Sequence, residues 1–275
     1  MKKLLWPLPL IVFFLASGTV FAQHGDGIKK RRPLPEEYGT IIINNYSEYN
    51  GLAAVVYPHW LHRSIYTCRL CHVDVGFAMK AGGTGITARD NEKGFYCGTC
   101  HNGKMLFRGK PVFKACEPSR STRGWISAQE AGRCDKCHSD GKQPDQDYDF
   151  YSFTAGFPKE RFGNGIDWEK AEAEGKIHLI DFINGVSARR PDFPIPSDDA
   201  IIPKIKGMPK VIFSHKKHMD WSGCELCHPE IFSIEKGGDE MSMTDNFNGE
   251  YCGACHGKVA FPLIECDRCH QSTSQ

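Results

Sequence analysis

The sequence predicts a mostly irregular chain with short α-helices, built as two tandem modules. Three observations lead to this prediction. Twelve of the 13 cysteines fall in six C-x-x-C-H motifs. A long stretch that includes two of these motifs recurs about 155 residues further on, and a third motif follows in each copy. Long segments with helical or strand periodicity are scarce, so we expect short helical turns around the motifs and loops between them.

The first residues are typical of an export signal. Lys2 and Lys3 precede an apolar run over 4–16, and Ala22 stands at a plausible cleavage point. The apolar run is too short to span a bilayer comfortably. We therefore expect 1–22 to be a signal peptide, and the mature chain to be periplasmic or extracellular and not membrane-spanning.

The charges of the chain nearly cancel, with 34 Lys and Arg against 33 Asp and Glu. This balance argues against nucleic acid or an anionic membrane as partner, because both select strongly basic surfaces. The basic run KKRR at 29–32 is interpreted as a solvated segment that is able to pair with an acidic group.

Each of the six motifs has two cysteines two residues apart and a histidine directly after the second. The cysteines are Cys68, Cys71, Cys97, Cys100, Cys134, Cys137, Cys224, Cys227, Cys252, Cys255, Cys266 and Cys269. The histidines are His72, His101, His138, His228, His256 and His270.

C-x-x-C-H is the attachment signature of c-type haem, in which two thiols bond to the porphyrin and the histidine binds the iron. Zinc sites use four cysteines or mixed sets and do not require a histidine after every pair. A redox dithiol occurs once per domain, on a βαβ pattern that is absent here. We therefore predict six covalently attached haem c groups, an attachment that takes place outside the cytoplasm.

The repeat extends beyond the motifs. The stretch VVYPHWLHRSIYTCRLCH at 55–72 aligns without a gap with VIFSHKKHMDWSGCELCH at 211–228. DNEKGFYCGTCH at 90–101 likewise matches DNFNGEYCGACH at 245–256. Each half continues with Gly-Lys and then a phenylalanine, Phe107 or Phe261.

The repeat predicts two three-haem modules, over 23–145 and 178–275. A linker over 146–177 joins them, with a short helix over 167–176 that ends at Gly175. The first module carries an insertion over 108–131, which holds the unpaired Cys116. A reactive or crosslinking role is open to this thiol, but we interpret it as a quiet, buried hydrophobe.

Six histidines remain outside the motifs, so each of six irons can have a second histidine. They are His24, His59, His62, His178, His215 and His218. His59 and His62, like His215 and His218, are three residues apart and share one helix face. Rival ligands are the methionines Met79, Met241 and Met243, or a residue from a neighbouring subunit.

The stretches VIFSHKKH, CELCH, YCGACHGKVAF and CDRCH at 211–270 resemble the three-haem domain of class III multihaem cytochromes. These are periplasmic and extracellular cytochromes of metal- and sulfate-reducing bacteria. The resemblance implies that His215 and His218, and by the repeat His59 and His62, are distal ligands to different haems. Small three-haem members have another distal histidine shortly before the second motif, where this chain has Asn248 and no histidine. His24 and His178 are therefore the remaining candidates.

The resemblance implies an electron carrier with low-potential bis-histidine haems and no catalytic residues, acting in respiratory electron transfer. Its redox partners would be other cytochromes or a membrane quinol-oxidising complex. One alternative is a homopolymer, a haem filament in which His24 is donated between subunits. The other is a multihaem reductase with one open haem face.

Overall fold

The computed structural model describes residues 32–116, 134–139, 148–196, 198–202 and 208–271. The chain divides into two compact units, 1–32 and 33–275, and of the first unit only Arg32 is described, which is exposed. The predicted signal peptide, His24 and most of the insertion lie outside the described residues. Within them, no helix is long and apolar enough to cross a membrane.

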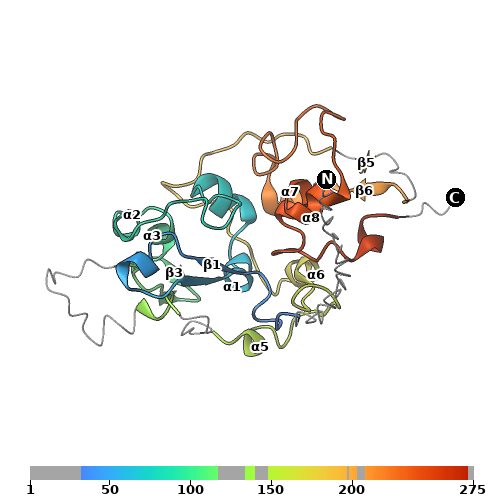
Figure 1. Ribbon diagram of the computed structural model, residues 1–275. Helices are drawn as coiled ribbons and strands as arrows, with labels where there is room; N and C mark the ends of the chain where they lie inside the picture. The colour runs from blue at the N-terminus through green and yellow to red at the C-terminus, as the bar shows by residue number, and fades with distance from the viewer. Residues whose placement is uncertain (1–31, 117–133, 140–147, 197, 203–207, 272–275) are drawn as a thin grey trace, which may run out of the picture. The chain divides into compact units, whose positions relative to one another are not determined.

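The elements of the first module are short (Figure 1). They are β1 (Thr40–Ile43), η1 (Glu48–Asn50), β2 (Val55–Pro58), α1 (His59–Arg63), η2 (Leu70–Asp74), α2 (Ala88–Glu92), α3 (Cys97–Cys100), β3 (Leu106–Phe107) and β4 (Lys110–Pro111). The linker holds α5 (Phe150–Phe153) and α6 (Trp168–Ala173).

The second module repeats several of these elements. Its own elements are β5 (Ala200–Ile202), β6 (Val211–Phe213), α7 (His215–Ser222), α8 (Met243–Asn248), η3 (Tyr251–Ala254) and η4 (Cys266–Arg268). Among the described residues the longest helix, α7, has 8 residues. The prediction of a mostly irregular chain with short helices is confirmed.

A two-stranded antiparallel ladder precedes each H-x-x-H pair. In the first module β1 pairs with β2, and in the second β5 pairs with β6. The third motif of each module returns to the same ladder, because Val56 N–H donates to the Cys137 carbonyl at 2.8 Å and Ile212 N–H to the Cys269 carbonyl at 3.2 Å. These bonds close each module on itself.

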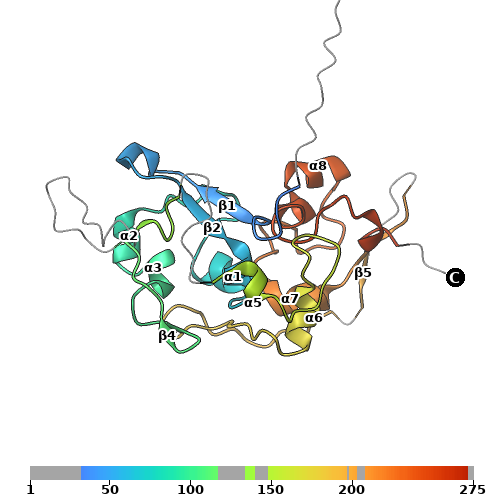
Figure 2. The same ribbon diagram turned by 90° about the horizontal axis from the view of Figure 1, so that it is seen from below.

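The hydrophobic core lies largely in the segment interpreted as a linker. Trp60 of α1 is 2% exposed and packs with Phe150, Ile166, Trp168 and Ile177. Its ring meets Phe150 edge to face, with centroids 5.1 Å apart. Figure 2 shows α5 and α6 next to α1. The described part of this segment, 148–177, therefore packs against the first module.

The helix predicted over 167–176 is confirmed as α6. It begins at Trp168, after Asp167 accepts a hydrogen bond from the Lys170 amide at 3.0 Å and so satisfies a free N–H of the first turn. It ends at Ala173, and Gly175 then takes φ +68°, a left-handed conformation that favours glycine.

Ion pairs join the two repeats. Arg190 donates to Asp74 of the first module and, at 2.5 Å, to Glu225 of the second. The Asp74 side chain is only 2% exposed. A buried carboxylate requires a partner, so Arg190 fixes the repeats to each other at this point.

Candidate haem-binding sites

One aromatic ring orders each H-x-x-H pair. Tyr57 stacks on His62 with centroids 4.3 Å apart and meets His59 edge-on at 4.8 Å. Phe213 does the same for His218 at 4.3 Å and His215 at 5.0 Å. Neither aromatic residue belongs to a haem motif, so the motifs alone do not reveal their role. In both repeats an aromatic residue stands two positions before the first histidine, and this shared position in the sequence could have identified Tyr57 and Phe213.

Hydrogen bonds to backbone carbonyls hold most imidazoles by Nδ1. Among the described residues these histidines are His59, His62, His72, His138, His218, His228, His256 and His270. A neutral imidazole that donates from Nδ1 presents an unprotonated Nε2, which is the form that binds a metal. The Nδ1 atoms of His101 and His215 are buried and lack a hydrogen bond of good geometry, although the Phe113 carbonyl lies close enough to His101 to act on its pKa.

The second histidine of each pair faces the histidine of the second motif in its own module. The His62 and His101 ring centroids are 6.2 Å apart, and those of His218 and His256 are also 6.2 Å apart. Imidazoles that bind one metal from opposite sides at about 2 Å each have centroids about 6 Å apart. The spacing in both modules therefore fits two axial ligands of one iron.

The first histidine of each pair lies near the histidine of the first motif. Burial lowers the pKa of His59 to about 4, and His62 and His72 contribute in the same direction. Burial also lowers the pKa of His215, followed by the charges of His228 and His218. These imidazoles are thus neutral at pH 7, as axial ligation requires.

Burial acts in the same way on the histidines of the second motifs. It lowers the pKa of His101 to about 4, with the charge of His62 as the next cause. The pKa of His256 is also lowered to about 4, chiefly by burial, and the Phe261 carbonyl partly opposes this.

The second motifs, YCGTCH and YCGACH, share a special backbone. Tyr96 and Tyr251 precede the first cysteine with φ of +50° and +45°, which is uncommon for a residue with a side chain. A Cβ on Gly98 would lie 1.9 Å from the Asn91 carbonyl oxygen, and one on Gly253 would lie 1.7 Å from that of Asn246. Only glycine permits this approach, so both motifs carry it.

The helices that these glycines touch are capped alike. Thr87 and Asp90 form a capping box at the start of α2, and Ser242 and Asp245 form one at the start of α8. Each box satisfies free N–H groups of the first turn. Two capped helices therefore support the two second motifs, which explains why the repeat extends upstream of the cysteines.

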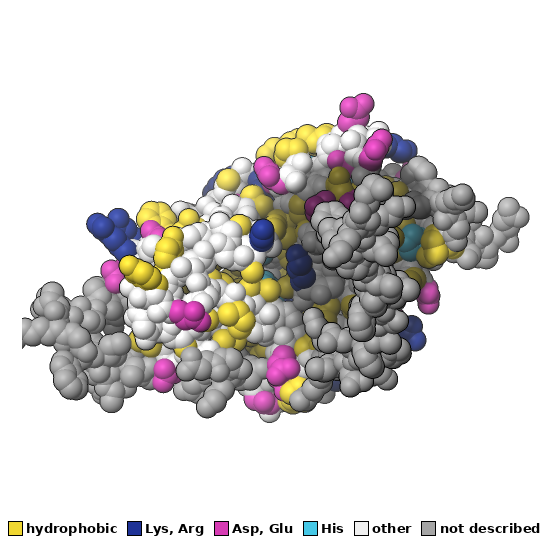
Figure 3. All heavy atoms as spheres, viewed as in Figure 1, with side chains coloured by type: hydrophobic (Ala, Val, Ile, Leu, Met, Phe, Trp, Pro, Cys, Tyr) yellow, Lys and Arg dark blue, Asp and Glu magenta, His cyan; other side chains and the backbone are white. Residues whose placement is uncertain are grey.

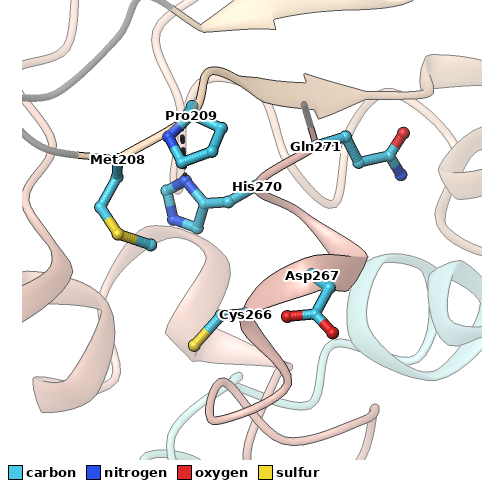
Figure 4. Close-up of a pocket in the computed structure, with 6 residues that line it drawn as sticks. All are labelled: Met208, Pro209, Cys266, Asp267, His270 and Gln271. Carbon is cyan, nitrogen blue, oxygen red and sulfur yellow. Dashed lines mark hydrogen bonds between the residues drawn. The ribbon is translucent and has the colours of Figure 1, made fainter. Parts of the chain in front are cut away.

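The third motifs are held at the ladders. His138 Nδ1 bonds to the Ala53 carbonyl at 2.6 Å, and His270 Nδ1 to the Pro209 carbonyl at 2.9 Å. His270 also lines a cavity of about 570 Å³ together with Met208 and Cys266 (Figure 4). A histidine and a cysteine of one motif thus line one cavity, where the haem attached to this motif would lie.

The structure brings no second histidine to either third motif within the described residues. His178 is exposed just after α6, and no hydrogen bond or ring contact among the described residues joins it to another histidine. His24 lies outside the described residues. The interpretation of these two histidines as distal ligands stays a prediction.

The cysteine environment suits thioether sulfur better than thiolate. Burial raises the pKa of Cys71 to about 12 and that of Cys97 to about 11. It also raises the pKa of Cys137 and Cys255 to about 12. Buried neutral sulfur agrees with a carbon–sulfur bond, and no group of three or more His, Cys, Asp or Glu side chains among the described residues could hold a metal ion such as zinc. The residues present therefore fit haem c.

The phenylalanine that matches Phe261 is not Phe107. Phe261 lies over His256 with centroids 4.3 Å apart, and the residue over His101, at 4.4 Å, is Phe113. Phe107 belongs to the β3–β4 hairpin and contacts Tyr148 at 5.2 Å. The sequence comparison was wrong here because the hairpin displaces the equivalent residue by six positions.

Cys116 lies near this region, half-buried and unpaired. Asn91 Nδ2 approaches its sulfur at 3.6 Å. The sulfur is also close enough to Cys97 to raise the pKa of that thiol. Its interpretation as a quiet hydrophobe stays a prediction.

The model of the family described as cytochrome c7 and related cytochrome c matches residues 55–139 and 211–271, which is more than half of the chain. The chain belongs to the cytochrome c7 family. Its two matched regions coincide with the duplicated motifs. This cytochrome c7 chain is therefore a multihaem c-type cytochrome, and electron transfer is its chemistry.

Three solved structures are similar to this chain. A c7-type three-heme cytochrome domain is 36% identical, over 27% of this chain and 94% of that one, with a TM-score of 0.26. The C-terminal hexaheme fragment of GSU1996 is 22% identical, over 88% and 99%, at 0.26. The dodecaheme cytochrome c GSU1996 is 22% identical, over 85% and 73%, at 0.26. No curated protein matches the chain.

Proposed function

We propose that this cytochrome is an exported hexahaem electron carrier in which every iron has two histidine ligands. Such ligation leaves no open coordination site, so the chain carries electrons and catalyses no reaction of its own. Two histidines also favour a low potential, since methionine–histidine ligation raises it. Its redox partners are other cytochromes or a membrane quinol-oxidising complex.

The observation that carries this proposal is the 6.2 Å spacing of the facing imidazoles, which both modules repeat. It supports two ligand pairs, His62 with His101 and His218 with His256. Two further pairs are proposed, His59 with His72 and His215 with His228. The last two rest on the electrostatic proximity of their imidazoles. By count, His24 and His178 remain for His138 and His270.

Bound haem supplies one-electron chemistry at each iron. The chain's own residues fix the position and surroundings of each haem. Carbonyl groups hold Nδ1 and so present Nε2, and Tyr57 and Phe213 prevent the distal rings from turning. Buried motif residues limit the access of water, which would otherwise weaken the local field.

Electron paramagnetic resonance of the purified oxidised protein tests the proposal, together with its optical spectrum and intact mass. We expect a mass increase equal to six haems and low-spin signals alone. A five-haem mass or a high-spin signal would contradict the proposal. The variant His178→Ala then shows whether His178 binds an iron, because loss of this ligand should convert one low-spin signal into a high-spin signal.

A second function is supported by the third motifs. Neither His138 nor His270 makes a hydrogen bond or ring contact with another described histidine. One haem with an open face would suit a reductase of nitrogen or sulfur oxyanions. Spectral shifts with nitrite, sulfite or cyanide would favour that function over a carrier, and unchanged spectra would exclude it.

A further inference from the structure

Arg63, the last residue of α1, is held by groups from both repeats and the linker. Its Nη1 donates to the Val259 carbonyl at 3.0 Å. Its guanidinium carbon lies 5.1 Å from the ring centroid of Trp168 and 4.7 Å from that of Trp221. Two indole faces attract a cation strongly when water is excluded. The guanidinium is therefore fixed in place.

The charge of Arg63 lacks a carboxylate of its own. Its Nε is buried without a hydrogen bond, and no ion pair of the described residues includes it. The carboxylate that acts electrostatically on Arg63 is that of Glu160, and its Oε2 already accepts a hydrogen bond from Arg268 at 2.8 Å. Among the described residues, one carboxylate thus serves two guanidinium groups, and one positive charge is left without a carboxylate.

This charge lies where haem attachments of the two modules meet. Arg63 Nη1 bonds to the Val259 carbonyl, and the Val259 N–H donates in turn to the Cys255 carbonyl at 3.0 Å. Cys68 and Cys255 both lie within electrostatic range of the guanidinium. Cys68 belongs to the first motif of the first module, and Cys255 to the second motif of the second. Cys68 and Cys255 also lie within electrostatic range of each other. The attachment points are therefore close to each other as well as to Arg63.

We propose that Arg63 is a positioning residue for electron transfer between the modules, whose uncompensated charge raises the reduction potential of the haems attached at Cys68 and Cys255. This rests on the proposed carrier function. A haem iron that accepts one electron loses one unit of positive charge, so a fixed nearby cation favours the reduced form. The electron is then stabilised at the junction of the modules, where it must cross.

A potentiometric titration followed by optical absorption tests this proposal. Arg63→Met removes the charge and keeps much of the volume, whereas Arg63→Lys keeps the charge. In the Arg63→Met protein we expect at most two of the six haems to be reduced at a lower potential. In the Arg63→Lys protein we expect the titration curve to stay near that of the unaltered protein. A tenfold change in the ratio of oxidised to reduced haem corresponds to about 59 mV. Arg89→Met, on the exposed face of α2, should change nothing.

An unchanged curve for a low-spin Arg63→Met protein overturns the proposal, as does a Lys variant that shifts as much as Met. If Arg63→Met does not fold, Glu160→Gln serves, because removal of the opposing charge should raise the same potentials. No rise would also overturn the proposal. The carrier function fails separately, if the unaltered protein lacks six low-spin haems.

Discussion

The rings of His62 and His101 face each other at 6.2 Å, although 39 positions separate them in the sequence. His218 and His256 repeat the relationship at the same distance. Two independent copies of one geometry indicate a shared function and make single substitutions comparable between modules.

Substitution of a distal histidine should change one haem. In His62→Met the iron at His101 would gain a thioether in place of an imidazole, which raises its potential. A redox titration should show one of the six haems at higher potential, with the spectrum of the other five unchanged. His218→Met is the matched variant in the second module. A change in several haems would contradict the assigned pair.

Loss of the aromatic support should disturb two haems together. Tyr57→Ala removes the ring that contacts both His59 and His62, at a cost of about 1 kcal/mol for each contact. Tyr57→Phe keeps the ring and should behave as the original. Electron paramagnetic resonance spectra should show two altered low-spin signals in the alanine variant. Unaltered signals would show that Tyr57 does not hold His59 and His62 in place.

The glycine of each second motif should not tolerate a methyl group. A Cβ on Gly253 would meet the Asn246 carbonyl oxygen at 1.7 Å, so Gly253→Ala should destabilise the fold by about 3 kcal/mol. Gly156→Ala is the control, because nothing lies within 4 Å of its added Cβ. Urea denaturation measures the difference. Equal stability of the two variants would show that α8 moves away freely.

The protein should lose stability as the pH falls from about 6.5 to 4. In the chain without haem, burial lowers the pKa of His59, His101 and His256 from 6.5 to about 4, and iron binding, which requires a neutral imidazole, acts in the same direction. The unfolded chain therefore binds more protons in this window, and the free energy of unfolding decreases on acidification. Each group contributes up to about 3 kcal/mol. Urea midpoints at several pH values measure this, and a flat profile would contradict it.

Arg190 should be essential for the contact between the repeats. Arg190→Ala leaves the Asp74 carboxylate buried without its partner, which costs about 3 kcal/mol. Arg189→Ala, at an exposed neighbouring position, should have little effect. Thermal unfolding of the two variants provides the comparison. If both unfold alike, the bridge contributes little.

The sequence alone predicted the parts of this protein that depend on neighbouring residues. Two thiols and a histidine within five positions define a motif whose chemistry is local, and the duplication of 55–72 at 211–228 needs no coordinates. The helix α6 was also predictable, because its cap at Asp167 and its stop at Gly175 lie within ten residues.

The tertiary structure decided which distant residues meet. The His62–His101 spacing depends on how β2, α1 and α3 pack, and the match of Phe113 with Phe261 depends on a hairpin that no local pattern placed correctly. Apolar side chains of the linker form the core because they pack around the buried Trp60. Burial and long-range contact are properties of the folded chain as a whole, so the sequence determined the haem motifs, and packing determined their surroundings.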